Sequence, residues 1–119
     1  MKNFRKLQVW EKSHLLTLSV YRHTEQFPAA GKFGLTSQIR RAASSVPANL
    51  AEGCGRAKNV EMARFCQIAF GSASELEYHL LPARDLGFLD EQSHTELDAQ
   101  TTEIKRMLTG LIQKLKAAA

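Results

Sequence analysis

The chain has 119 residues, of which 44% are hydrophobic and 24% are charged, and its formal net charge is +4 at pH 7. This length and composition predict one globular domain over residues 1–119, with a core that needs no disulfide or metal. The longest apolar runs are a few residues, which excludes a membrane-spanning segment, and an N-terminus without an apolar secretory core predicts a cytoplasmic protein.

The first predicted helix runs from about Leu7 to Glu25 and carries two apolar stripes. One stripe consists of Leu7, Trp10, His14, Leu18 and Tyr21, and the other, almost opposite, consists of Val9, Leu16, Val20 and Phe27. A helix in a monomeric bundle needs only one such stripe. We therefore expect His14 to lie in the core with a hydrogen-bond partner, and Val9, Leu16 and Val20 to contact a second subunit.

The second predicted helix follows a loop over residues 28–34, begins near Leu35 or Thr36 and ends near Gly53. Its apolar face consists of Leu35, Ile39, Ala42, Ala43, Val46 and Leu50. The opposite face is built from small residues that permit close approach of another backbone, which predicts that Ser37, Ser44, Ala48 and Ala51 belong to an oligomer interface. Pro47 leaves the Ala43 carbonyl without its usual helical partner and predicts a kink. Gly53 and Gly55 are expected to close the helix with positive φ angles.

Two further helices are predicted over about Asn59 to Leu86 and from an Asp90 cap to about Lys116. Asn59 is the expected cap of the first of them, and Gly87 ends it. The second contains a heptad pattern at Leu97, Thr101, Ile104, Leu108, Leu111 and Leu115. No strand-like alternation occurs in the chain. The predicted fold class is therefore all-α, an antiparallel up-down-up-down four-helix bundle.

Several short motifs resemble a known bacterial family. They are FxxLxVW at residues 4–10, FP at 27–28, SVPANLAEG at 45–53, GSASELE at 71–77 and LGFL at 86–89. Together they resemble the four-helix-bundle proteins of the 23S ribosomal RNA intervening-sequence family, over about Phe4 to Leu115. The resemblance implies a ring-shaped homo-oligomer, with a pentamer favoured, and no established enzymatic activity.

The polar residues within the helices predict a structural network rather than a catalytic site. Glu77 and Arg84 share the apolar side of one helix, and Glu52 adjoins the Gly53 turn, so all three are expected in ion pairs or hydrogen bonds. Glu75 and His79 predict a solvated pair, with metal binding as the alternative. Cys54 and Cys66 form no CxxC motif and predict reduced, packed thiols, with a disulfide or metal pair as the alternative. We expect no cofactor, no metal and no small-molecule substrate.

Charge is distributed unevenly along the sequence. Residues 1–64 carry 11 Lys and Arg against 4 Asp and Glu, a balance of +7, whereas residues 65–119 carry 5 against 8, a balance of −3. The basic residues that lie off the apolar stripes are Arg40, Arg41, Arg56, Lys58 and Arg64. They predict a non-enzymatic surface for RNA or a nucleoprotein.

The alternatives are charge pairing within the oligomer, and a protein-interaction scaffold for a partner such as a reverse transcriptase, since accessory proteins of diversity-generating retroelements are similar bundles. A further alternative is an enzyme that uses Glu77, Arg84 and His79.

Overall fold

The structure, a computed structural model, describes residues 3–28 and 32–118. Four long helices make up most of it: α1 over Gln8–Thr24, α3 over Ser37–Cys54, α4 over Asn59–Asp85 and α5 over Glu91–Ala117. A short 3₁₀-helix, η1, covers Phe4–Lys6, and a π-helical turn, η2, covers Lys32–Thr36. No strand occurs in the described residues, which confirms the all-α class and its four helices. No helix among them has a stretch long and apolar enough to cross a bilayer.

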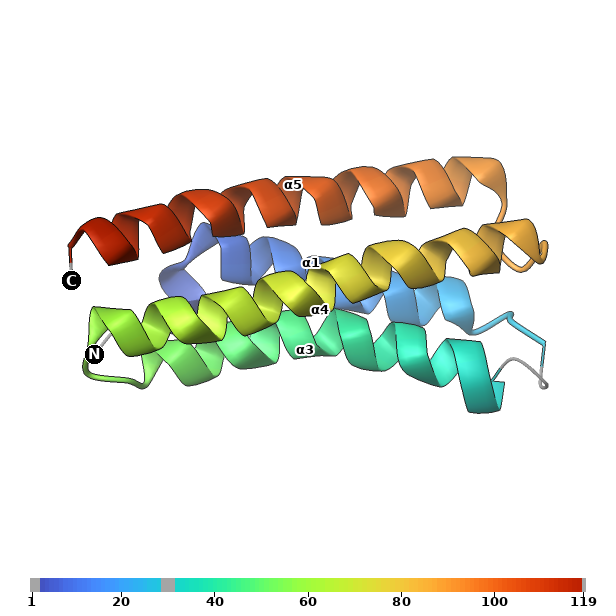
Figure 1. Cartoon of the computed structure of the whole chain (residues 1–119). Coiled ribbons are helices and arrows are strands. Elements are labelled where there is room, and N and C mark those ends of the chain that lie inside the picture. The colour runs from blue at the N-terminus through green and yellow to red at the C-terminus, as the bar shows by residue number, and fades with distance from the viewer. Residues whose placement is uncertain (1–2, 29–31, 119) are drawn as a thin grey trace.

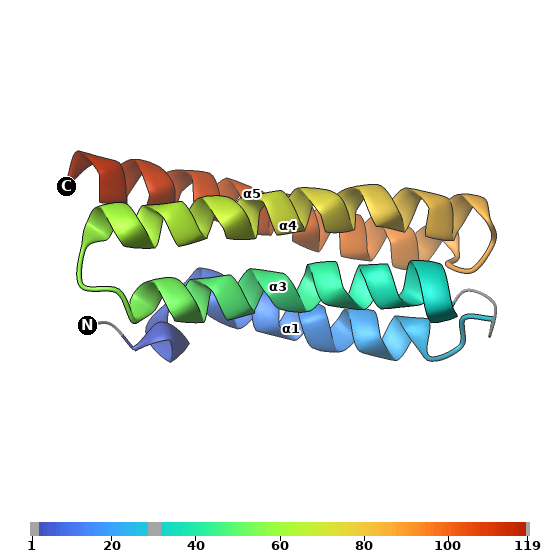
Figure 2. The same cartoon turned by 60° about the horizontal axis from the view of Figure 1, so that its bottom comes forward.

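The four helices pack side by side along their lengths (Figure 1). Helices α1 and α4 each pack against both α3 and α5, so α1 and α4 occupy opposite corners of the bundle. Consecutive helices run in opposite directions, and the N-terminus and the C-terminus lie at the same end (Figure 2). The extents of the molecule are 45 × 22 × 19 Å. One end therefore holds η1, the α3–α4 turn and the end of α5, and the other end holds the α4–α5 turn.

The core follows the predicted periodicity on α3 and α5. Ile39, Val46 and Leu50 of α3 are fully buried, and the heptad residues of α5 are buried except for Leu111, which is half-buried. On α1 the prediction was wrong. Val9, Leu16 and Val20 are no more than 4% exposed within the single chain, whereas Leu18 and Tyr21 are exposed. The stripe assigned to a second subunit is the core stripe, because both stripes are apolar and periodicity does not say which one faces inward.

The residues of α3 that precede Pro47 are bonded to two different helices. The Thr17 hydroxyl of α1 lies 3.1 Å from the Ala43 carbonyl, the acceptor that Pro47 leaves without a backbone donor, and 2.8 Å from the Ser13 carbonyl. Beyond Ala43, the Ser72 hydroxyl of α4 donates to the Ser45 hydroxyl at 2.9 Å. Hydrogen bonds two residues apart in α3 therefore tie this helix to α1 and to α4.

The glycines and caps correct two predictions. Gly53 has no positive φ angle; a Cβ there would lie 3.0 Å from the Phe65 Cβ, so the glycine permits close contact between α3 and α4. Gly55 likewise has a negative φ, and Gly87, with φ of 80°, is the glycine that turns the chain after α4. The cap position of α4 is Lys58 rather than Asn59, without a side-chain hydrogen bond.

Asp90 caps α5 as predicted. Its carboxylate accepts a hydrogen bond from the Ser93 amide at 2.7 Å. This bond, with a second from the Ser93 side chain, lowers the pKa of Asp90 below its ordinary value of 3.8. The cap is therefore charged and stabilising at neutral pH, and its contribution is lost as the pH falls through the lowered pKa.

Candidate nucleic-acid interface

The five basic residues predicted to bind nucleic acid do not form one patch. Arg40 and Arg41 lie in the first turns of α3, whereas Arg56 and Lys58 follow its last turn and Arg64 lies near the start of α4. The 15 residues from Arg41 to Arg56 correspond to roughly 22 Å along a helix axis. The two groups therefore face separate parts of the surface.

Arg40 is tied to the neighbouring helix. Its Nε donates to the Thr24 hydroxyl at 2.8 Å, its Nη2 donates to the Tyr21 carbonyl at 3.3 Å, and its guanidinium carbon lies 4.6 Å from the centre of the Tyr21 ring. All three contacts join the start of α3 to the end of α1. Arg40 is half-buried and has a structural role that the sequence did not reveal, whereas Arg41 is exposed.

Arg56, Lys58 and Arg64 lie at the end of the bundle where other basic residues gather. Residues 3–11, 52–64 and 111–118 meet at this end and contain seven Lys and Arg against three Glu, a balance of +4. We call the seven the basic end: Arg5, Lys6, Arg56, Lys58, Arg64, Lys114 and Lys116. Four of them, on η1 and α5, were missed by sequence reasoning because they are distant in the chain. The signal in the sequence that could have found these four residues was their position close to the ends of predicted helices, which a bundle brings together.

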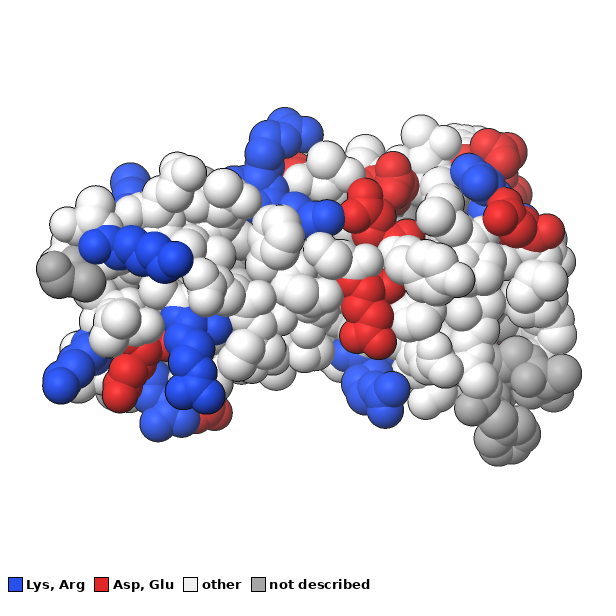
Figure 3. Space-filling model, in the orientation of Figure 1, with Lys and Arg blue, Asp and Glu red and all other residues white. Residues whose placement is uncertain are grey.

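The space-filling view shows this polarity. In Figure 3, Lys and Arg gather at the end that holds the α3–α4 turn, and most of the Asp and Glu lie nearer the opposite end. Residues 20–28 and 75–98, which meet near the α4–α5 turn, contain two Arg against eight Asp and Glu, a balance of −6. The asymmetry between sequence halves is therefore an asymmetry between the two ends of the bundle.

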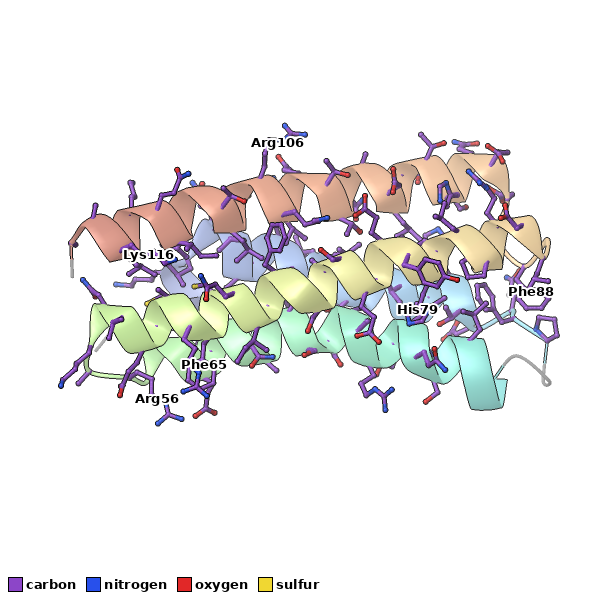
Figure 4. All side chains as sticks on the ribbon, viewed as in Figure 1. Arg56, Phe65, His79, Phe88, Arg106 and Lys116 are labelled. Atoms are coloured by element: carbon purple, nitrogen blue, oxygen red, sulfur yellow. The ribbon has the colours of Figure 1, made fainter. Side chains whose placement is uncertain are left out.

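The side chains of the basic end differ in how strongly they are held. Arg56 donates to the Glu52 carboxylate at 2.7 Å, and its guanidinium carbon lies 4.9 Å from the centre of the Phe65 ring (Figure 4). The prediction that Glu52 pairs with a nearby arginine is thus confirmed. Lys58 and Arg64 are exposed and form no ion pair with any residue in 3–28 or 32–118. These two cations are accessible to an external phosphate.

The ion pair expected for Glu77 is present, and its partner lies on a neighbouring helix. The Lys105 ammonium of α5 donates to the Glu77 carboxylate at 2.8 Å and lies 5.1 Å from the centre of the Phe70 ring. Arg84 instead donates to Asp85 at 3.1 Å and lies 3.8 Å from Glu91. A lysine on the adjacent helix approaches Glu77 more closely than a residue two turns along the same helix.

No histidine in residues 3–28 or 32–118 bonds to Glu77 or Arg84. His79 lies 3.4 Å from the Glu75 carboxylate, as an i,i+4 pair. His14 is half-buried rather than in the core, with its ring stacked on Trp10 at 5.0 Å. Within residues 3–28 and 32–118, no three His, Cys, Asp or Glu side chains gather as a potential metal site. Cys54 and Cys66 are both buried.

The remaining predicted interface residues lie on the surface of α3. Ser37 and Ala48 are exposed, and Ser44 and Ala51 are half-buried. Large apolar side chains are exposed elsewhere, on two helices at opposite corners of the bundle. They include Leu15 and Leu18 on α1, and Val60, Ile68, Tyr78 and Leu81 on α4.

A model of the family described as 23S rRNA-intervening sequence protein matches residues 5–110. The chain belongs to this family. A crystal structure of a protein of unknown function from the S23 ribosomal protein family of Bacteroides thetaiotaomicron is similar, with a TM-score of 0.81 and 22% sequence identity. The similarity covers 88% of this chain and 95% of that one, and at this identity it shows a shared fold. No curated protein matches the chain significantly.

Aromatic residues of the motifs that carried the resemblance contact one another in the structure. Phe27 of FP and Phe88 of LGFL lie 5.6 Å apart between ring centres, near the α4–α5 turn. Phe4 and Trp10 of the first motif lie 4.9 Å apart. These motifs therefore hold helix ends and helix pairs together, whereas the basic end lies largely outside them.

Proposed function

We propose that this protein is a non-enzymatic, cytoplasmic homo-oligomer that binds RNA through the phosphate backbone, at its basic end. The observation that carries the proposal is the gathering of seven Lys and Arg from η1, the α3–α4 turn and α5 at one end, with Lys58 and Arg64 exposed. Such contacts release counterions and require no base-specific hydrogen bonds.

Assembly would multiply these contacts. The exposed apolar residues lie on α1 and α4, which occupy opposite corners, so two different faces carry them. Different faces in contact form a heterologous interface, and a heterologous interface of suitable rotation closes into a ring. A ring of parallel subunits would bring every basic end to one side, where weak single contacts reinforce one another. Five subunits is the number favoured by the resemblance to the family.

The assembly is tested by light scattering coupled to gel filtration. We expect a mass close to five times 13.3 kDa. Leu15→Asp on α1 and Ile68→Asp on α4 should reduce it, since each places a charge without a partner in the proposed contact. Thr109→Asp on α5, exposed and outside both faces, is the matched control. A wild-type monomer at micromolar concentration would overturn the ring.

RNA binding is tested by fluorescence anisotropy with several unrelated RNAs at rising salt. Affinity should fall steeply with salt and differ little between sequences. Lys58→Ala, Arg64→Ala and Lys116→Ala combined should flatten the log–log salt slope by roughly 0.7 for each lost contact. A triple variant away from the basic end, Lys12→Ala with Arg22→Ala and Arg106→Ala, removes the same charge and should bind nearly as wild type does. In Figure 4, Arg106 points outward from the middle of α5.

The scaffold alternative predicts a different result. A protein that docks onto an acidic partner protein would form the same oligomer and yet show no RNA binding at about 50 mM salt, where phosphate contacts are strong. Absence of binding under these conditions would overturn the RNA proposal.

A further inference from the structure

A polar groove lies between the end of α1 and the start of α3, away from the basic end. Its volume is about 500 Å³. The lining residues are Tyr21, Thr36, Ser37, Arg40, Arg41 and Ser44. Two of the six are arginines, the other four carry hydroxyl groups and none is acidic. Every side chain in the lining is therefore able to donate a hydrogen bond to an anion.

Arg40 is already oriented before any ligand arrives. Its contacts with the Thr24 hydroxyl, the Tyr21 carbonyl and the Tyr21 ring fix the guanidinium against α1. These hydrogen bonds occupy two of its five N–H groups, and three remain. Most of the conformational entropy that binding would otherwise cost has been lost on folding. Arg41, the next residue, is exposed and able to approach the same anion from the solvent side.

Thr36 provides an independent observation. The residue is 2% exposed, and its hydroxyl has no hydrogen-bond partner within residues 3–28 and 32–118. Threonines in α-helices commonly bond the carbonyl four residues back, but Thr36 ends the π-helical turn η2, whose carbonyl spacing differs. An unsatisfied buried hydroxyl in the wall of an arginine-lined groove costs stability in the free protein. A bound acceptor would satisfy this hydroxyl after a rotation of its side chain.

We propose that this groove binds a phosphate monoester, with its phosphoryl group held by Arg40, Arg41 and the Thr36 hydroxyl. A phosphoryl dianion offers three acceptor oxygens in different directions, which suits two guanidinium groups and a hydroxyl. The groove is larger than a phosphate ion and falls within the range of small-molecule sites, so the organic part of the ester has room. The site shares no residue with the basic end, so this proposal is independent of RNA binding there.

The site is tested by isothermal titration calorimetry at low salt, with uridine 5′-monophosphate as the probe and uridine as its uncharged counterpart. The nucleotide should bind and the nucleoside should not. Arg41→Ala should weaken binding at least about tenfold, since it removes a charge-assisted contact without a structural role. Lys58→Ala, at the basic end, should leave it unchanged. The proposal is overturned if millimolar nucleotide gives no heat, if uridine binds equally well, or if Arg41→Ala binds as wild type does.

Thr36→Val separates a binding role of the hydroxyl from a structural one. It removes the hydroxyl and keeps the shape, so the free protein should melt at the same or a higher temperature. Binding of the nucleotide should nevertheless weaken several-fold. Unchanged nucleotide binding, or a clear loss of stability, would contradict the assignment of Thr36.

The triple variant Lys58→Ala, Arg64→Ala and Lys116→Ala is used to find whether the phosphate monoester belongs to a free nucleotide or to the end of a nucleic acid strand. If an oligonucleotide with a 5′-phosphate binds more tightly than its 5′-hydroxyl form, and Arg41→Ala abolishes the difference, the groove takes the end of a nucleic acid strand. If only the mononucleotide binds, the groove takes a free nucleotide. Either result supports a phosphate monoester site.

Discussion

The two halves of α3 hold their arginines in different ways. Before Pro47, Arg40 packs against α1 through Thr24 and Tyr21, and its charge is partly enclosed. After Pro47, the helix packs on α4 through Gly53 and leads into an exposed turn that carries Arg56 and Lys58. One half uses a cation to join helices beside a defined groove, and the other presents cations to the solvent.

This difference indicates how equal charges acquire unequal roles. A pinned guanidinium loses little entropy on binding and favours one geometry, which suits a single phosphate group in a groove. Solvated side chains on a turn adapt to many geometries and act mainly through their summed charge, which suits a nucleic acid backbone. Position relative to neighbouring helices, rather than residue type, separates the two.

The largest expected effect comes from separating α3 and α4 at the end that carries the turn. Gly53→Val should destabilise the protein by about 1–3 kcal/mol, because even its Cβ would meet the Phe65 Cβ at 3.0 Å. It should also weaken RNA binding, since the turn between the two helices would move, and leave nucleotide binding at the groove intact. Urea denaturation at fixed protein concentration measures the stability. Gly110→Val on α5, where an added Cβ meets nothing within 4 Å, is the control.

A second substitution tests whether Arg40 is structural and Arg41 is not. Arg40→Ala should cost about 2 kcal/mol, because it removes a charged hydrogen bond to the Thr24 hydroxyl and a cation–π contact. Arg41→Ala should change the free energy of unfolding by less than about 0.5 kcal/mol, as exposed substitutions usually do. Equal costs for the two variants, measured by urea denaturation, would remove the distinction between the pinned and the exposed arginine.

The junction between the two halves of α3 is tested at Thr17. Thr17→Val should cost about 1 kcal/mol, because the Ala43 carbonyl then lacks both its backbone donor and the hydroxyl at 3.1 Å. Thr109→Val removes a hydroxyl that bonds a carbonyl on the exposed side of α5, where water replaces it, and should cost less. Thermal melts of both variants at one protein concentration provide the comparison. A smaller cost for Thr17→Val than for the control would show that the Pro47 site needs no partner from α1.

Most of the fold was predictable because it depends on local patterns. Apolar spacing gave the four helices to within a few residues, and the Asp90 cap and the α5 heptad were identified from residues close in sequence. The lost partner of the Ala43 carbonyl also followed from Pro47. Its replacement by Thr17, 26 residues earlier, did not, because it depends on how two helices face each other.

The errors have the same physical origin. Both α1 stripes are apolar, and only packing against α3 and α5 decides that Val20 faces inward and Leu18 outward. An ion pair was expected for Glu77, but its partner Lys105, on α5, was not identified. The basic set was assembled from α3 and α4 alone, so Lys114 and Lys116, which the bundle brings to the same end, were missed. Each error concerns a contact between segments distant in the chain.

The smallest expected effect sharpens the description of the basic end itself. Glu52 is the acidic residue that pairs with Arg56 there, with both side chains about half exposed. Exposed pairs contribute little to stability, so Glu52→Gln should change the free energy of unfolding by less than about 0.5 kcal/mol. It removes a negative charge beside the proposed RNA surface and releases Arg56 for phosphate, so RNA affinity at low salt should rise by about threefold and the salt slope should steepen. Glu96→Gln is the matched control, at an exposed residue toward the α4–α5 turn, and should leave RNA affinity unchanged. If Glu52→Gln also leaves affinity and slope unchanged, the Phe65 contact is what holds Arg56, and Lys58 and Arg64 carry the interaction without it.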